Sequence, residues 1–338
     1  TFEENLERLA ELGIRVGLNL QPHQEVIATA PLEAVDFVRL LAKKAYEAGA
    51  SLFTVLYSDN VLARERLSRV APEDLDRAPA WLYEGMGRAF REGAARLAVS
   101  GNDPKALAGL DPERIGRAQK AQAQAYEPAL KAITEFATNW SIVPFAHPGW
   151  ARAVFPELPE KEAVERLWAA IFQATRVLEE DPVAAWREHN RRLHEKVAYL
   201  NARRFHALHF QGPGTDLTVG LAEGHLWQGG ATEAQNGVVC NPNLPTEEVF
   251  TAPHRARVEG VVRASRPLAL WGELVEGIWA RFQDGVAVEV GAEKNAELLL
   301  KALETDEGAR RLGEVALVPA DNPIAKTGLV FFDTLFDE

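Results

Sequence analysis

The sequence predicts a two-domain α/β protein, with a parallel-sheet α/β domain at the amino terminus and an α+β, largely antiparallel domain at the carboxyl terminus. First, its 338 residues exceed what a single hydrophobic core usually organises. Second, β-branched runs alternate with amphipathic helical segments through the first half, and short runs punctuated by glycine follow residue 205. We therefore expect domains at 1–180 and 205–338, joined by a bridging helix at 181–204.

Strands and helices alternate through the first half of the chain. Apolar residues at helical spacing predict an opening helix around 6–14, and a β-branched run at 25–30 predicts a strand that Pro31 ends. A helix over 33–48 ends at Gly49, a favourable carboxyl-terminal cap. Further strands are expected at 51–56, 96–100 and 140–144, and further helices at 81–92, 114–136, 161–177 and 182–204. This alternation implies a parallel sheet covered on both faces.

The second half of the chain has a different pattern of apolar residues and glycines. Short alternating runs with intervening glycines predict antiparallel strands joined by tight turns. The clearest of these strands are 216–221, 258–262 and 286–291, and helices are expected at 296–303 and near 307–312. A β-like run at 329–332 precedes an acidic cluster at 333–338.

Composition and charge exclude several classes of protein. No apolar run approaches the roughly 20 residues that a membrane span needs, and no signal sequence is evident, so we expect a cytoplasmic protein. The net charge of −12 argues against a nucleic-acid partner, which requires a basic surface, and is better matched to metal ions or amino-bearing ligands. The chain has no Walker-type phosphate loop or complete dinucleotide fingerprint, so no nucleotide cofactor is expected.

Candidate nucleophiles are few. Cys240 is the single cysteine, which excludes an internal disulfide and a thiolate zinc site, and nothing near it in the sequence supplies a base. Ser100 ends a strand but has only half of the Gly-x-Ser-x-Gly pattern. Cys240 is therefore expected to be a small apolar residue, although hydrolysis by serine or cysteine stays open as an alternative.

The histidines do not form a recognisable zinc motif. His189 and His194 are five residues apart, about 140° around a helix, so they do not share a face and are expected at the surface. His206 and His209 are three apart in an expected strand and would point to opposite faces. Neither pair is expected to coordinate one metal ion jointly.

Three glutamates stand out among the carboxylates. Glu248 and Glu314 lie in the apolar segments Leu244-Pro245-Thr246-Glu247-Glu248-Val249-Phe250 and Arg311-Leu312-Gly313-Glu314-Val315-Ala316-Leu317, and Glu338 ends the acidic cluster. A lone glutamate beside apolar residues is most often a half-exposed strand residue. Composition alone does not separate that role from a functional one.

These segments resemble the thermophilic aminopeptidase family of dinuclear-metal exopeptidases, and the resemblance extends along the whole chain. Other segments that carry it are Glu4-Asn5-Leu6, Ala48-Gly49-Ala50, Asn139-Trp140, Pro148-Gly149-Trp150, the stretch from His209 to Leu217, Trp227-Gln228-Gly229-Gly230, Asn241-Pro242-Asn243 and Asp321-Asn322-Pro323-Ile324.

The resemblance implies a metal-dependent aminopeptidase whose catalytic domain is 205–338. Two divalent ions, cobalt or zinc with magnesium or manganese tolerated, would activate a water that attacks the first peptide bond of a peptide with a free amino terminus. Glu248 would hold one ion, Glu314 would lie between both, and Glu338 would be a third site carboxylate, with Glu314 or Glu338 as proton shuttle. The resemblance also implies a homodimer.

The family pattern continues beyond residue 338 with two histidines, an aspartate and a tyrosine. From this we expect a chain that is incomplete at its carboxyl terminus and inactive as given. The alternative to a peptidase is a non-catalytic α/β protein that binds a small molecule at the carboxyl ends of its parallel strands.

Overall fold

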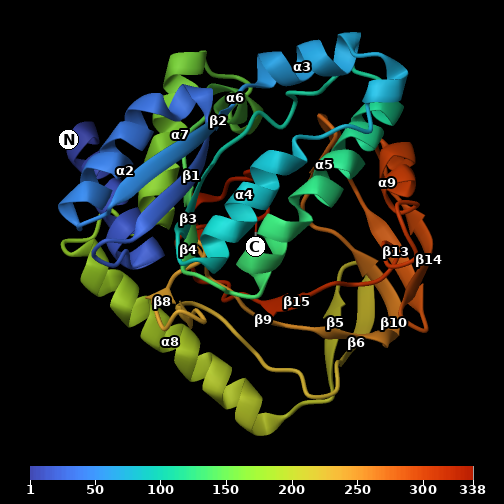
Figure 1. The fold of residues 1–338 in the computed structure, drawn as a ribbon. Coiled ribbons are helices and arrows are strands. Elements are labelled where there is room, and N and C mark those ends of the chain that lie inside the picture. The colour runs from blue at the N-terminus through green and yellow to red at the C-terminus, as the bar shows by residue number, and fades with distance from the viewer. Residues whose placement is uncertain (338) are drawn as a thin grey trace. The chain divides into compact units, whose positions relative to one another are not determined.

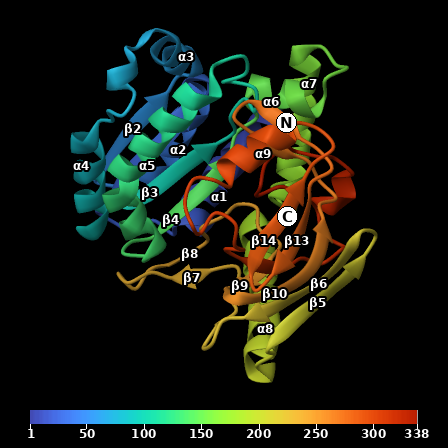
Figure 2. The same cartoon turned by 90° about the vertical axis from the view of Figure 1, so that its right-hand side faces the viewer.

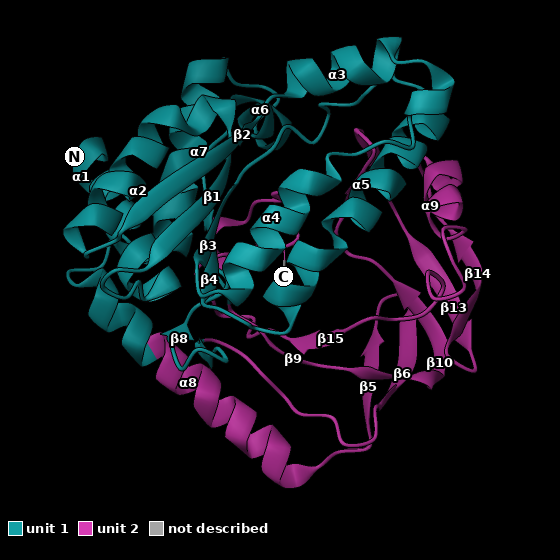
Figure 3. Cartoon of the chain, viewed as in Figure 1, with its two compact units in different colours: residues 1–188, 231–246 teal, residues 189–230, 247–338 magenta. Residues whose placement is uncertain are grey.

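The computed structural model describes residues 1–337, which form two compact units (Figure 3). Unit 1 comprises Thr1–Glu188 and Ala231–Thr246, and unit 2 comprises His189–Gly230 and the described residues from Glu247 onward. The domain boundaries expected from the sequence stay a prediction. No helix in the described part of the chain is long and apolar enough to cross a membrane.

Unit 1 is built on a parallel sheet with the strand order β2-β1-β3-β4 (Figure 1). Its strands are β1 (Glu25–Pro31), β2 (Leu52–Ser58), β3 (Ala95–Ser100) and β4 (Trp140–Pro144). Each coincides with an expected strand, and the parallel pairing confirms the α/β class. The segment around Asn243 adds a parallel bridge at Ile142 of β4, and β7 (Thr232–Glu233) pairs with β8 (Val239–Cys240).

Helices separate the strands of unit 1. They are α1 (Phe2–Leu12), a π-helical turn (Gly13–Leu18), α2 (Val35–Glu47), α3 (Asn60–Arg69), α4 (Ala80–Arg91), α5 (Pro112–Thr134), α6 (Pro148–Val154), α7 (Glu160–Ala174) and the start of α8 (Pro182–Arg203). A capping box of Thr1 and Glu4 begins α1, and the Asp111 side chain caps α5. Helices α4 and α5 pack together over Ile27 of β1, with Phe90 and Ile133 fully or almost fully buried.

Unit 2 contains an antiparallel sheet with the order β14-β13-β10-β6-β5. Its strands are β5 (Ala207–Gly212), β6 (Thr215–Leu221), β10 (Pro253–Arg263), β13 (Trp279–Gln283) and β14 (Val286–Gly291). The inward residues Val219, Val258 and Phe282 form a core with Leu193 and Leu200 of α8. The largely antiparallel second part that the sequence predicts is therefore confirmed.

A second, smaller ladder joins β9 (Val249–Thr251) to β15 (Val315–Leu317) in antiparallel register. The two strands lie side by side in Figure 1, and Figure 2 shows the larger antiparallel sheet of the same unit. The remaining elements of unit 2 are the pair β11 (Leu268–Leu270) and β12 (Glu273–Val275), the helix α9 (Ala296–Ala302) and a 3-10 turn at Ala325–Thr327.

Two expected elements are not formed in the structure, and some of its helices were not expected. Residues 307–312 form turns rather than a helix, although the Asp306 side chain accepts the N–H groups of Gly308 and Ala309 at 2.8 and 2.9 Å as an amino-terminal cap would. The segment is short and contains Gly308, a poor helix former, so the capped turn does not propagate into a helix. Residues 329–332 are not a strand, because the Asp337 carboxylate accepts the N–H of Phe331 at 2.8 Å. The helix α3 was not expected, since it buries only Leu67 and has little apolar periodicity.

Candidate functional site

The ladder of β9 and β15 places Glu248 and Glu314 on one face. Glu248 immediately precedes β9 and Glu314 immediately precedes β15, and Phe250 pairs with Ala316 at the middle of the ladder. Because side chains alternate along a strand, continuing each strand by one residue places Glu248, Phe250, Ala316 and Glu314 on the same side. Along the ladder, Glu248 therefore lies on one side of the Phe250–Ala316 pair and Glu314 lies on the other side.

The opposite face of the ladder belongs to the core of unit 2. Val249 and Val315 are 3% and 7% exposed and pack in the core that contains Val219 and Phe282, with Leu317 against them. Burial alternates along 247–251, with Glu247, Val249 and Thr251 buried and the two residues between them half-buried. This alternation fixes which face is available for chemistry, because a one-residue slip would place Glu248 in the core.

The electrostatics of the two glutamates are coupled. Burial, together with the negative charge of Glu314, raises the pKa of Glu248 from its ordinary 4.5 to about 7. Burial also raises the pKa of Glu314. Neither side chain makes a hydrogen bond or ion pair with any residue in 1–337. Two partly desolvated carboxylates thus repel each other, and no cationic side chain among residues 1–337 forms an ion pair with either of them.

A glycine-containing segment supports β9 from the side away from β15. Gln228 exchanges two backbone hydrogen bonds with Phe250, each 2.9 Å long. A Cβ on Gly229 would lie 2.8 Å from the Glu248 carbonyl oxygen, so only glycine allows this close approach. Asn201 of α8 clamps the same segment by accepting the N–H of Trp227 at 2.8 Å and donating to its carbonyl at 3.1 Å.

An acid–histidine pair lies directly beside Glu248. Nε2 of His189 on α8 is 3.6 Å from Oε2 of Glu247, and the two residues are 8% and 3% exposed. The expectation that His189 is a surface residue is therefore wrong, whereas His194 is exposed. Helical spacing alone could not reveal this, because the partner of His189 lies far away in the sequence.

The other histidines singled out from the sequence lie elsewhere. His209 is on β5, where its Nε2 is 2.7 Å from Oδ1 of Asp216, and both side chains are exposed. His206 precedes that strand. In unit 1, Nε2 of His147 is 3.3 Å from Oε2 of Glu33. Within residues 1–337 no group of three or more His, Cys, Asp and Glu side chains is arranged to hold a metal, and Glu338 lies outside the described residues.

Neither candidate nucleophile has a basic side chain as a hydrogen-bond partner in the described part of the chain. Cys240 is 0% exposed, and burial raises the pKa of its thiol, which disfavours the thiolate. The Ser100 hydroxyl donates to the Val143 carbonyl at 3.4 Å. Both environments fit structural residues better than catalytic ones.

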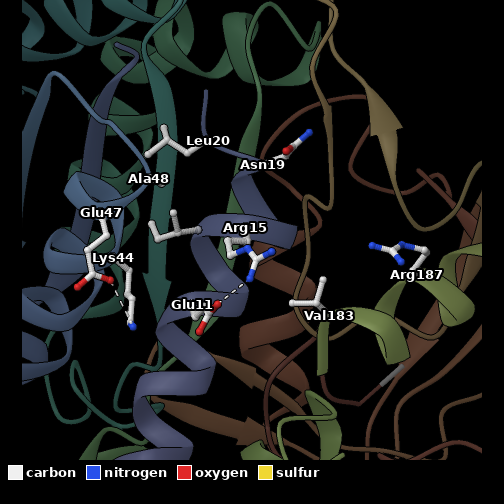
Figure 4. Close-up of a pocket in the computed structure, with 10 residues that line it drawn as sticks. Glu11, Arg15, Asn19, Leu20, Lys44, Glu47, Ala48, Val183 and Arg187 are labelled. Carbon is white, nitrogen blue, oxygen red and sulfur yellow. Dashed lines mark hydrogen bonds and ion pairs between the residues drawn. The ribbon is translucent and has the colours of Figure 1, made fainter. Parts of the chain in front are cut away.

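Unit 1 contains a cavity of about 520 Å³ (Figure 4). Four charged residues of its lining form ion pairs, with Glu11 2.8 Å from Arg15 and Glu47 3.4 Å from Lys44, and Arg187 also lines the cavity. Residues 19–20 of the lining precede β1, and Ala48 precedes β2, so the cavity lies at the amino ends of the strands. Open α/β sheets bind ligands at the opposite edge, so this cavity does not support the small-molecule-binding alternative. A second cavity of about 900 Å³ is lined by Tyr57 near the carboxyl end of β2 and by Leu107 beyond β3, and it leaves that alternative open.

Comparisons with known proteins agree with these features. The sequence matches the family described as thermophilic metalloprotease (M29) over residues 2–338. It is 80% identical over 337 residues to "Aminopeptidase T" of Thermus aquaticus, covering 100% of this chain and 83% of that protein. It is 43% identical over 337 residues to "Aminopeptidase 2" of Geobacillus stearothermophilus, covering 100% of this chain and 82% of that protein.

The fold has a solved relative as well. The structure described as wild-type AmpT from Thermus thermophilus superposes with a TM-score of 0.94 at 78% identity, covering 100% of this chain and 83% of that one. The mixed α/β architecture and the family resemblance inferred from the sequence are both confirmed. The chain belongs to the thermophilic metalloprotease family M29.

Proposed function

We propose that this protein is a metal-dependent aminopeptidase that hydrolyses the amino-terminal peptide bond of peptides, with Glu248 and Glu314 as ligands of two divalent ions. The observation that carries the proposal is the pair of half-desolvated carboxylates on one face of the β9–β15 ladder. Their mutual repulsion has no counter-charge among residues 1–337, and a divalent cation would supply one. The aminopeptidase names of the relatives point to the same activity.

The donor chemistry fits such an ion. Carboxylate oxygens bind zinc, cobalt, manganese and magnesium, and no thiolate competes, because Cys240 is buried within unit 1. When bound, two divalent ions would polarise the scissile carbonyl and lower the pKa of a water. Cobalt or zinc is the proposed pair, and Glu338 is the proposed third carboxylate.

The chain's own residues have three tasks in this proposal. Glu248 and Glu314 fix the position of the reacting centre from opposite ends of the ladder, which holds them because β9 is paired on both edges. The negative face attracts the ammonium group of a substrate's free amino terminus. Glu314 or Glu338 carries a proton to the leaving amine through an oxygen that a metal ion does not occupy.

Several finer features stay predictions. A homodimer and a catalytic region spanning 205–338 follow from the family resemblance, and a cytoplasmic location follows from the sequence. Nothing in the described residues supports the expectation that the chain is inactive.

The proposal is tested by hydrolysis of a short peptide and of the same peptide with an acetylated amino terminus. We expect cleavage of the free peptide only, loss of cleavage after exhaustive chelation, and recovery with Co²⁺ or Zn²⁺. Glu248→Gln and Glu314→Gln should each abolish turnover, whereas Glu289→Gln, at an exposed residue paired with Arg281, should leave it unchanged. Full activity after complete metal removal would contradict the proposal.

A further inference from the structure

We propose that His189 is a positioning residue for Glu248 and acts through Glu247. The inference rests on the proposed function, in which Glu248 binds a metal ion. It concerns a histidine that lies on α8, outside the ladder that bears the two glutamates.

The first step of the argument is the burial of Glu247. Its side chain is 3% exposed, and an ionised carboxylate in such a place is costly unless it has a partner. His189 supplies that partner, with Nε2 at 3.6 Å from Oε2 and its own ring 8% exposed. The pair therefore fixes the Glu247 side chain against α8.

The second step is the rigidity of α8 in this region. Leu193 and Leu200, four and eleven residues after His189, belong to the core of unit 2. Asn201 makes two hydrogen bonds to the backbone of Trp227. The helix that carries His189 is therefore held at several points, and it can serve as a fixed anchor.

The third step links Glu247 to the direction of Glu248. Burial alternates along 247–251, which is the pattern of an extended segment with one buried face. Val249 is anchored in the core on that face, and Glu247 is anchored on the same face by His189. With both neighbours fixed, Glu248 must project to the other side, toward the face that it shares with Glu314.

Groups that orient metal ligands without touching the metal typically contribute 10–100-fold to metal affinity or activity. A displacement of about 1 Å at a catalytic group can itself cost about 100-fold in rate. Loss of the His189 contact removes one anchor of the Glu247 side chain on the buried face, which would let Glu248 turn away from the ladder. We therefore expect His189 to matter for metal binding although it binds no metal.

The test compares two amide variants of different length. Gln places its Nε2 about where the histidine Nε2 lies, whereas the side chain of Asn is one methylene shorter. We expect His189→Asn to weaken Co²⁺ binding, measured by titration calorimetry, and kcat/KM by about 10–100-fold. His189→Gln should restore most of both. His194→Asn, at an exposed position on the same helix, is the matched control and should behave as the parent protein.

A double-mutant cycle separates positioning from a general structural effect. If His189 acts through Glu247, then His189→Asn should have little further effect on Co²⁺ affinity in a Glu247→Ala background. An equal effect of His189→Asn in both backgrounds would overturn the inference. Equal Co²⁺ affinities of the parent and His189→Asn would do so as well.

A structural measurement keeps this inference distinct from the proposed function. Metal-free crystal structures of the parent and His189→Asn should differ by more than about 1 Å at the Glu248 carboxylate. An unmoved carboxylate overturns the positioning role, whatever the activity. A parent protein that binds no metal at Glu248 contradicts the proposed function, and the crystal comparison still decides the role of His189.

Discussion

Replacing Glu248 by glutamine should stabilise the metal-free protein while abolishing its metal response. The folded state holds the Glu248 carboxyl at a pKa of about 7 against an ordinary 4.5, so folding favours its protonated form. The folded state then binds more protons than the unfolded state between these values, and stability falls as the pH rises from about 4.5 to about 7. Above pH 7 the Glu248 side chain is charged in the folded state, and the free energy of unfolding is lowered by the full cost of burying that charge.

The size of this cost follows from the pKa difference. A difference from 4.5 to about 7, at about 1.4 kcal/mol per pKa unit, corresponds to about 3 kcal/mol as an upper bound. The side chain is only half-buried, and screening by solvent reduces the expected value to about 1–2 kcal/mol. Glu248→Gln removes the charge with little change of shape, so it should recover that amount at pH 8 and almost none at pH 4.

The assay is urea denaturation of the parent and Glu248→Gln at pH 8 and pH 4 with excess chelator. After the chelator is removed, added Co²⁺ should stabilise the parent and leave the variant unchanged, because only the native parent site binds the ion. Glu289→Gln is the control, since Glu289 is exposed and its pKa is lowered by Arg281, so its removal should not stabilise the protein. A Glu248→Gln variant that is less stable than the parent at pH 8 would refute the reasoning.

Three further predictions concern the surroundings of the site. Gly229→Ala forces its Cβ against the Glu248 carbonyl oxygen and should lower kcat/KM at least about tenfold. Gly212→Ala is the control and should leave kcat/KM unchanged, because a Cβ there meets nothing within 4 Å. Equal kinetics of the two variants would contradict the close-approach argument. Val249→Ala removes buried methyls and should cost about 2 kcal/mol in urea denaturation, and a cost near zero would argue against its place in the core. Cys240→Ala should retain peptidase activity, and native Cys240 should resist iodoacetamide because the thiol is buried and its pKa is raised. Loss of activity in the variant, or after iodoacetamide, would restore the cysteine-nucleophile alternative.

The parallel sheet of unit 1 could be predicted because its strands and helices carry their own signals. The four strands are short apolar runs, and α2, α4 and α5 each show an apolar face at helical spacing. Local sequence decides these elements, and the tertiary structure agrees with it. The same holds for β6, β10 and β14 of unit 2, whose alternation is visible in the sequence.

The two errors have different physical causes. At 307–312 the Asp306 side chain caps the first N–H groups, but a segment this short that contains Gly308 does not propagate a helix. At 329–332 the Asp337 carboxylate accepts the N–H of Phe331 that pairing with a neighbouring strand would use. Hydrophobic periodicity registers neither effect.

The candidate site could be predicted only in part. Glu248 and Glu314 were found by resemblance, and their shared face depends on the register between β9 and β15, which lie more than sixty residues apart in the sequence. His189 was missed because its partner, Glu247, is brought to it only by the fold. Its own neighbours in the sequence, two arginines and an asparagine, are typical of an exposed helix face.

Anomalous scattering at the cobalt edge tests the central claim most directly. Crystals of the protein grown with Co²⁺ should show an anomalous peak at about 2.0–2.2 Å from a carboxylate oxygen of Glu248, and Glu314 should contact the same peak or one about 3.5–4 Å away. Cobalt bound only at other residues, with both glutamates free of metal, would contradict the account.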